Sequence, residues 1–158
     1  MKQPIKGSKK PLKKTKTKSL PKKRNHPQYG TSKLEEDFAR EFLDKLGVEY
    51  VYQFEAKDIK RYYDFYLPQH NLLVEIDGDF WHGNPDKYQE DELKGHQKRA
   101  QRVDEYKNKW ALLHGIPLLR IWESDIRKNP SKVMKVLKEE LNIQDKRRLM
   151  NEDKKRRH

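Results

Sequence analysis

The segment RYYDFYLPQHNLLVEID, residues 61–77, decides the fold of this 158-residue chain. Its two halves are rich in aromatic and aliphatic residues that alternate in position, whereas Pro68–Asn71 between them consists of turn formers. If residues 68–71 form the loop, Leu67 faces Leu72 in an antiparallel hairpin, and facing residue numbers sum to 139. This register places Asp64 directly opposite Glu75.

Three carboxylates, Asp64, Glu75 and Asp77, share one face of this hairpin. The other face is apolar and is formed by Tyr63, Phe65, Leu67, Leu72, Val74 and Ile76. Directly opposed carboxylates repel each other and destabilise a sheet, so a cation is expected to neutralise them. Carboxylate oxygens suit a hard divalent ion, which predicts a Mg²⁺ site in which Mn²⁺ could substitute. The alternative is a solvated acidic face on an edge hairpin.

Further elements are predicted on both sides of the hairpin. Ser32, with Glu35 three residues on, predicts a helix that ends at Gly47, followed by a strand from Val48 to Phe54. After the hairpin, helices are predicted over 97–114 and 130–141, with a strand over 117–122 between them. The apolar stripe expected on the first of these helices consists of Ala100, Val103, Tyr106, Trp110 and Leu113. The order αβββαβα predicts an α/β domain.

Positive charge is concentrated at the two ends of the chain, which has a net charge of +12. Residues 1–24 contain ten Lys and one Arg with no acidic residue, and the core between the ends is slightly acidic. We therefore predict a disordered basic arm over 1–30, a domain over 31–142 and a second disordered basic tail over 143–158. The arm is expected to contact nucleic-acid phosphates through Lys9, Lys10, Lys13 and Lys14. A solubilising tail and a localisation signal are the alternatives.

Several classes of protein are excluded by composition. The chain has no cysteine, which rules out a disulfide framework and a structural zinc site of the Cys/His type with thiolate ligands. It has no repeat and no long apolar run, so solenoids and membrane spans are not expected. The lack of an apolar N-terminal stretch argues against a secretory signal and favours a cytoplasmic protein.

The predicted order of elements and the positions of the carboxylates resemble those of a known group of nucleases. The αβββαβ order, with Asp64 on the second strand and Glu75-Ile76-Asp77 on the third, resembles the PD-(D/E)XK nuclease fold. The segments Tyr63-Asp64-Phe65, Val74–His82, Asp104 ahead of Gly115, and Leu118–Glu123 together resemble very-short-patch repair endonucleases. They also resemble the related phage homing endonucleases with an E, D, H, D active-site pattern. The resemblance implies a restriction-endonuclease-like core in which a mixed four-stranded sheet is flanked by helices.

The same resemblance implies roles for individual residues in a Mg²⁺-dependent endonuclease acting on double-stranded DNA. Asp64 would be the principal metal ligand and Glu75 the second, and Glu35 would reach the metal through water. His82 would be the general acid or base, and Asp104 would position it. Phe80 and Trp81 match the aromatic pair that the repair enzymes insert between DNA bases.

Two positions and the lack of cysteine depart from that pattern. Asp77 stands in the catalytic set where the superfamily usually has lysine, which shifts water activation to His82 or a metal-bound hydroxide. Tyr63 replaces the usual proline before Asp64, and the missing cysteines favour the homing endonucleases over the repair enzymes. A non-catalytic nucleic-acid-binding protein, a structural basic protein, and a restriction or transposition nuclease remain as alternatives. The sequence leaves open whether the protein is a monomer or a homodimer.

Overall fold

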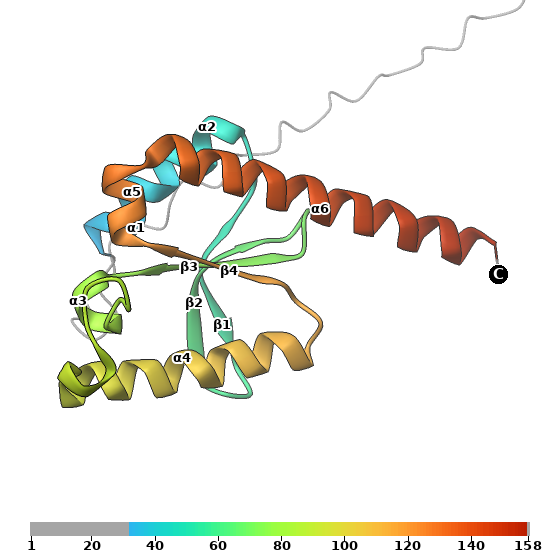
Figure 1. Cartoon of the computed structure of the whole chain (residues 1–158). Helices are drawn as coiled ribbons and strands as arrows, with labels where there is room; N and C mark the ends of the chain where they lie inside the picture. Colours follow the sequence, from blue (N-terminus) through green and yellow to red (C-terminus); the bar gives the residue numbers. More distant parts are fainter. Residues whose placement is uncertain (1–31, 158) are drawn as a thin grey trace, which may run out of the picture. The chain divides into compact units, whose positions relative to one another are not determined.

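The structure is a computed structural model that describes residues 32–157. The predicted basic arm, with Lys9, Lys10, Lys13 and Lys14, lies outside the described residues. The described part is an α/β domain in which helices cover both faces of a mixed four-stranded sheet (Figure 1). No helix in this part of the chain is long and apolar enough to cross a membrane.

The strands and helices follow the predicted order with additions. The strands are β1 (Val51–Ala56), β2 (Arg61–Leu67), β3 (Leu72–Asp77) and β4 (Leu118–Trp122). One continuous N-terminal helix comprises α1 (Lys33–Phe38), the π-helical turn η1 (Ala39–Leu43) and α2 (Asp44–Leu46). The other helical elements are α3 (Asp79–His82), the 3₁₀ turn η2 (Glu90–Glu92), α4 (Gly95–Leu113), α5 (Glu123–Lys128) and α6 (Pro130–Arg156). The short elements α3, η2 and α5 were not predicted, and β1 begins three residues later than expected.

The sheet has the order β1-β2-β3-β4 and the register predicted for its central hairpin. Phe65 pairs with Val74, and Leu67 pairs with Leu72, so facing residue numbers sum to 139 as expected. Strand β1 pairs antiparallel with β2, whereas β4 pairs parallel with β3 because α4 carries the chain across the sheet. The parallel pairing places Asp77 beside Trp122 at the ends of β3 and β4.

The N-terminal helix begins and ends as its sequence indicates. The Ser32 hydroxyl accepts a hydrogen bond from the Glu35 backbone N–H (3.1 Å), which satisfies one of the free donors of the first turn. The Glu35 carboxylate does not fold back onto the cap, however, because it accepts a hydrogen bond from Tyr52 on β1. At the other end, Gly47 adopts the left-handed conformation (φ 64°) that stops the helix.

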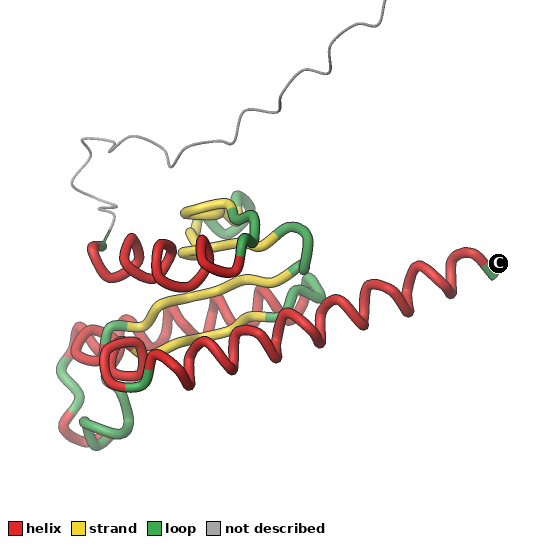
Figure 2. The backbone as a smooth tube through the Cα atoms, turned by 90° about the horizontal axis from the view of Figure 1, so that it is seen from above, coloured by secondary structure: helices red, strands yellow, loops and turns green. Residues whose placement is uncertain are grey.

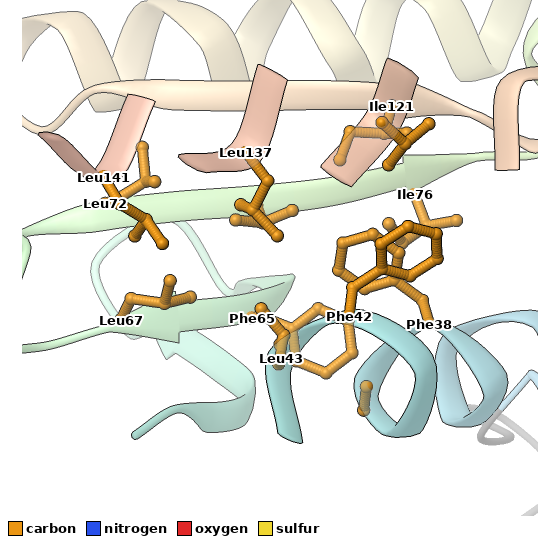
Figure 3. Close-up of a cluster of buried hydrophobic side chains, with 13 residues drawn as sticks. Phe38, Phe42, Leu43, Phe65, Leu67, Leu72, Ile76, Ile121, Leu137 and Leu141 are labelled. Carbon is orange, nitrogen blue, oxygen red and sulfur yellow. The ribbon is translucent and has the colours of Figure 1, made fainter. Parts of the chain in front are cut away.

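The main hydrophobic core lies between the sheet and the helices α1 and α6 (Figure 3). Its buried side chains include Phe38, Phe42, Leu43, Phe65, Leu67, Leu72, Val74, Ile76, Ile121, Leu137 and Leu141. These positions confirm the predicted apolar face of the hairpin with one exception. Tyr63 belongs instead to a second cluster under α4, where its ring lies 5.6 Å from the ring of Trp110.

The predicted apolar stripe of α4 is confirmed at Trp110, which is buried, and is wrong at two of its other positions. Tyr106 and Leu113 are exposed, and the buried residues of this helix are Gln97, Lys107, Trp110 and Ala111. The stripe is wrong at Tyr106 and Leu113 because it assumed that α4 covers an apolar surface along its whole length. Part of α4 instead covers the acidic residue Glu75 of β3, and there the helix contributes Lys107.

The prediction that the basic tail is disordered is also wrong, because residues 143–156 continue helix α6 (Figures 1 and 2). Two contacts attach this helix to the turn between β2 and β3. His70 Nδ1 lies 2.9 Å from the Asp145 carboxylate, and the Arg148 guanidinium donates to the Gln69 carbonyl (2.8 Å). Figure 2 shows that the helix projects beyond the sheet after this turn.

Candidate active site

Asp64 and Glu75 lie side by side where β2 and β3 meet, at the end of the hairpin away from its turn. The Asp64 carboxylate accepts a hydrogen bond from the Ile76 backbone N–H (2.7 Å), so its side chain crosses to the neighbouring strand. Glu75 is buried, with 4% of its surface exposed. The sequence therefore predicted correctly that these two carboxylates are neighbours.

Glu35 approaches the same pair from helix α1. Its carboxylate accepts a hydrogen bond from the Tyr52 hydroxyl (2.7 Å), and its negative charge contributes to raising the pKa of Asp64. Glu35 is half-buried whereas Glu36 is exposed, because Glu35 lies on the apolar face of the helix, which points into the domain. Three elements, α1, β2 and β3, thus bring three carboxylates together.

This carboxylate cluster (Glu35, Asp64 and Glu75) carries an excess of buried negative charge. Burial raises the pKa of Asp64 well above its ordinary value, and the charges of Glu75 and Glu35 raise it further. Burial also raises the pKa of Glu75, although the ammonium group of Lys107 opposes that shift. One lysine cannot neutralise three carboxylates, so the cluster is electrostatically suited to a bound cation.

Lys107 is a site residue that the sequence analysis missed. It extends from α4, is 8% exposed, forms an ion pair with Glu75, and lies 4.8 Å from the centre of the Tyr63 ring. The Tyr63 hydroxyl donates to the Lys107 carbonyl (2.7 Å), which fixes this turn of α4 against β2. Its spacing in the sequence could have identified it. Lys107 lies three residues after Asp104 and three before Trp110, so all three side chains lie on one face of the helix.

Replacing Lys107 with methionine should lower the free energy of unfolding by about 3 kcal/mol near neutral pH, because Glu75 would lose its buried partner. Without the ammonium, the pKa of Glu75 rises further above its unfolded value. The loss should therefore be small at low pH and should grow as pH rises through the folded pKa. Urea denaturation in EDTA at about pH 5 and about pH 8 measures this, with the exposed Lys109→Met as control. Equal losses at both pH values would show that the ion pair does not carry the effect.

A second group of charged residues, the histidine cluster, lies at the ends of β3 and β4. His82 Nδ1 is 2.6 Å from the Asp104 carboxylate and 3.7 Å from that of Asp77. Arg120, another residue that the sequence analysis missed, binds both oxygens of Asp77 (2.6 and 2.9 Å) and one oxygen of Asp104 (3.2 Å). Arg120 and a protonated His82 together supply two positive charges to the two carboxylates, so this cluster is balanced in charge, unlike the carboxylate cluster.

The environment of His82 favours its protonated form. Burial lowers the pKa of His82, but the hydrogen bond and charge of Asp104 and the charge of Asp77 outweigh burial, so the pKa lies above its ordinary value. A hydrogen bond between Nδ1 and a carboxylate keeps the proton on Nδ1 and leaves Nε2 for proton transfer. Asp104 therefore contacts His82 in the way expected of a positioning residue.

Ligand atoms of Asp77, His82 and Asp104 lie within 4.8 Å of one another, which is compact enough for a metal ion. The Arg120 guanidinium already binds both carboxylates of this set, and a cation there would have to displace it. The carboxylate cluster offers only oxygen ligands and has unbalanced charge. Oxygen ligands are the kind that Mg²⁺ prefers. Among the described residues, however, it is the histidine cluster that brings three ligand atoms within 4.8 Å of one another.

The aromatic pair Phe80 and Trp81 lies on α3, directly before His82. Their exposed fractions are 42% and 64%, and both rings contact His96, with centroids 5.2 and 5.4 Å apart. The neighbouring Asp79 has a different environment, since it is buried and binds Asn84 (2.7 Å), Lys87 (2.5 Å) and Ser124 (3.0 Å). Asp79 anchors the loop after β3, so that the aromatic pair and His82 are held at a fixed position.

Gly83 ends α3 where little room is available. Gly83 and Gly47 both have φ in the left-handed region (62° and 64°), so alanine should cost about 1 kcal/mol at either position. A Cβ at Gly83 would also lie 2.6 Å from Leu93 Cδ2, whereas at Gly47 it would meet nothing within 4 Å. Gly83→Ala should therefore lose more unfolding free energy than Gly47→Ala in urea denaturation. Equal losses would mean that Leu93 moves aside freely.

The structure brings the predicted site residues into two adjoining clusters. Glu35, Asp64 and Glu75 form one, and Asp77, His82 and Asp104 form the other, with β3 contributing to both. Lys107 and Arg120 are additions from α4 and β4. In comparisons with protein-family models, with curated proteins and with solved structures, the chain has no match in any of the three.

Proposed function

We propose that this chain is a Mg²⁺-dependent DNA endonuclease with a restriction-endonuclease-like core of the PD-(D/E)XK type. The observation that carries the proposal is the convergence of two clusters at one end of the sheet. One holds buried carboxylates with raised pKa values, and the other holds a histidine in contact with a carboxylate. A structural protein or a simple nucleic-acid-binding protein would gain nothing from burying like charges together.

The carboxylate cluster would hold the metal. Asp64 and Glu75 supply oxygen ligands from adjacent strands, and Glu35 is placed to bind a metal-bound water from α1. The chemistry that Mg²⁺ or Mn²⁺ supplies in such a site is polarisation of a phosphodiester and a lowered pKa of its water. Lys107 opposes the rise in the pKa of Glu75 and so favours the ionised form, which is the form that binds a cation.

His82 would transfer the proton in hydrolysis. With Nδ1 bound to Asp104, its Nε2 acts as a general base toward the attacking water. Asp77 stands in the superfamily's lysine position, but its bonds to Arg120 and its proximity to His82 suit it to a positioning role. Arg120 then serves to hold Asp77 and Asp104 in place around the imidazole.

Double-stranded DNA is the proposed substrate. The net charge of +12, most of it in residues 1–24, favours phosphate contacts that do not depend on base sequence. The exposed aromatic pair, Phe80 and Trp81, lies directly beside His82, where wedging between bases would distort the DNA near the scissile bond. Similarity to very-short-patch repair and phage homing endonucleases is part of this proposal.

The test is incubation of the purified full chain with supercoiled plasmid and long genomic DNA in Mg²⁺, in Mn²⁺ and in EDTA. Asp64→Ala and His82→Ala are compared with wild type, and the exposed carboxylate variant Asp91→Ala is the matched control. Nicks or breaks are expected with either metal for wild type and Asp91→Ala, and none with EDTA or with the two site variants. Binding without cutting under every metal condition would replace the nuclease proposal with a non-catalytic DNA-binding protein.

A further inference from the structure

Helix α6 carries a row of exposed hydrophobic residues beside the face that packs on the core. Val136, Ile143 and Met150 are 38%, 44% and 59% exposed and follow one another at intervals of seven residues. Seven residues are nearly two helical turns, so the three side chains form one stripe about 20 Å long. We call these three residues the outer stripe. The buried residues Val133, Leu137, Leu141 and Gln144 lie on a different face of the same helix.

Acidic and basic residues flank the outer stripe in separate blocks. Glu139 and Glu140 lie between its first and second members, and Lys146 and Arg147 lie between its second and third. The order along the helix is thus acidic and then basic, with Ile143 at the centre. Such a helix is complementary to a copy of itself that runs in the opposite direction.

The pairing of two such helices can be worked out from the residue numbers. In an antiparallel arrangement about a twofold axis at Ile143, Val136 faces Met150 of the partner. Glu139 and Lys146 lie on one flank of the stripe, and Glu140 and Arg147 lie on the other. An antiparallel pair sets each flank against the same flank of the partner, so Glu139 lies beside Lys146 of the second copy and Glu140 lies beside its Arg147. A parallel arrangement would instead set acidic residues against acidic ones. Only the antiparallel arrangement joins apolar to apolar side chains and opposite charges at the same time.

We propose that the outer stripe is a self-association surface on which a second copy of this chain packs its own α6 antiparallel. A nucleic acid is the other candidate occupant, since α6 also carries Lys154 and Arg156. It fits less well, because Glu139 and Glu140 would repel phosphates and the apolar stripe would remain uncovered. The attachment of α6 to the turn between β2 and β3 keeps this part of the helix fixed to the domain, with the stripe exposed.

Because the chain contains no cysteine, single cysteines can report the pairing directly. Ile143→Cys lies on the proposed twofold axis and should form a disulfide-linked dimer under mild oxidation. Val136→Cys alone should cross-link poorly with itself but well when mixed with Met150→Cys. The matched control is Leu149→Cys, at a position that is 55% exposed but lies off the stripe. Cross-linking of Ile143→Cys no faster than Leu149→Cys, or strong self-linking of Val136→Cys, would overturn the antiparallel pairing.

Charge reversal gives an independent test by sedimentation over a range of protein concentrations. Wild type should dimerise, the pair Glu139→Lys and Glu140→Lys should be monomeric, and adding Lys146→Glu and Arg147→Glu should restore the dimer. Circular dichroism of each variant checks that α6 is folded. A monomer at every concentration, or association that requires duplex DNA, contradicts the proposal. These readouts do not depend on DNA cleavage, so they separate this inference from the proposed nuclease activity.

Discussion

Replacing Asp64 with asparagine should make the metal-free protein more stable to heat while slowing metal-dependent DNA cutting about a thousandfold. The loss of activity would follow from removing the proposed principal ligand of a metal ion, because such an ion contributes several kcal/mol to catalysis, at about 1.4 kcal/mol for each factor of ten. The gain in stability follows from the electrostatics of the carboxylate cluster. The asparagine side chain retains an oxygen that can accept the hydrogen bond from the Ile76 backbone N–H.

The direction of the stability change follows from the raised pKa of Asp64. Burial, Glu75 and Glu35 all disfavour its ionised form in the folded protein. A carboxyl group whose folded pKa exceeds its unfolded pKa lowers stability as pH rises through the folded value. Above the unfolded pKa this carboxyl group therefore costs folding free energy, and asparagine, which carries no charge, removes that cost.

Thermal denaturation with and without Mg²⁺ distinguishes this account from a purely structural one. Wild type should melt at a higher temperature as Mg²⁺ is added, because a ligand that binds only the folded state stabilises it. Asp64→Asn should melt higher than wild type in EDTA and should gain little from the metal. The exposed Asp91→Asn should behave like wild type in both conditions. A variant that is less stable in EDTA would show that Asp64 is a structural hydrogen-bonding residue instead.

The hairpin of β2 and β3 could be predicted from the sequence because several local signals agree there. A turn of Pro68–Asn71 fixes the register, and the alternation on each side decides which face is buried. This register alone predicted that Asp64 and Glu75 are neighbours. Glu35 was also predictable, because the resemblance calls for a carboxylate on the first helix and Glu35 lies on the apolar face of that helix with Phe38 and Phe42.

The residues missed were those whose role depends on tertiary contacts. Lys107 sits on a helix face that an apolar pattern would exclude, and it is buried because Glu75 lies opposite. Arg120 occupies a β4 position whose ladder partner is Glu75, and only the fold shows that its side chain reaches Asp77 and Asp104. Local periodicity contains no information about such charge pairs between distant elements.

The length of α6 was missed for another reason. Its C-terminal half is polar and basic, and composition alone suggested a tail. The segment from Ser131 to Arg156 nevertheless contains no glycine or proline, and most of its residues have high helix propensity. The absence of helix breakers was the informative signal, and the contact of Asp145 with His70 shows that the domain supports the helix beyond the predicted end.

Replacing Asp104 with asparagine should move the His82 inflection of the pH–rate profile to lower pH and slow cutting about a hundredfold. The asparagine amide can still contact the imidazole, but it lacks the charge that helps to raise the pKa of His82. A general base must be neutral, so the rate of wild type should rise with pH through the raised pKa of His82. In the variant the rise comes at lower pH, and the plateau is lower because a less basic imidazole accepts a proton less readily.

The stability of the folded protein should also depend on pH through His82. Its folded pKa is raised, so the stabilisation that it provides is fully present below the unfolded pKa and is lost as pH rises through the folded value. Asp104→Asn should weaken that dependence. NMR titration of the imidazole signals reads the pKa of His82 without DNA, and the other histidines serve as internal standards. Glu105→Gln, at the adjacent exposed carboxylate on α4, is the matched control. If the inflection stays in place in Asp104→Asn while the NMR pKa of His82 falls, the group that limits the rate is not His82, and water activation belongs to the carboxylate cluster.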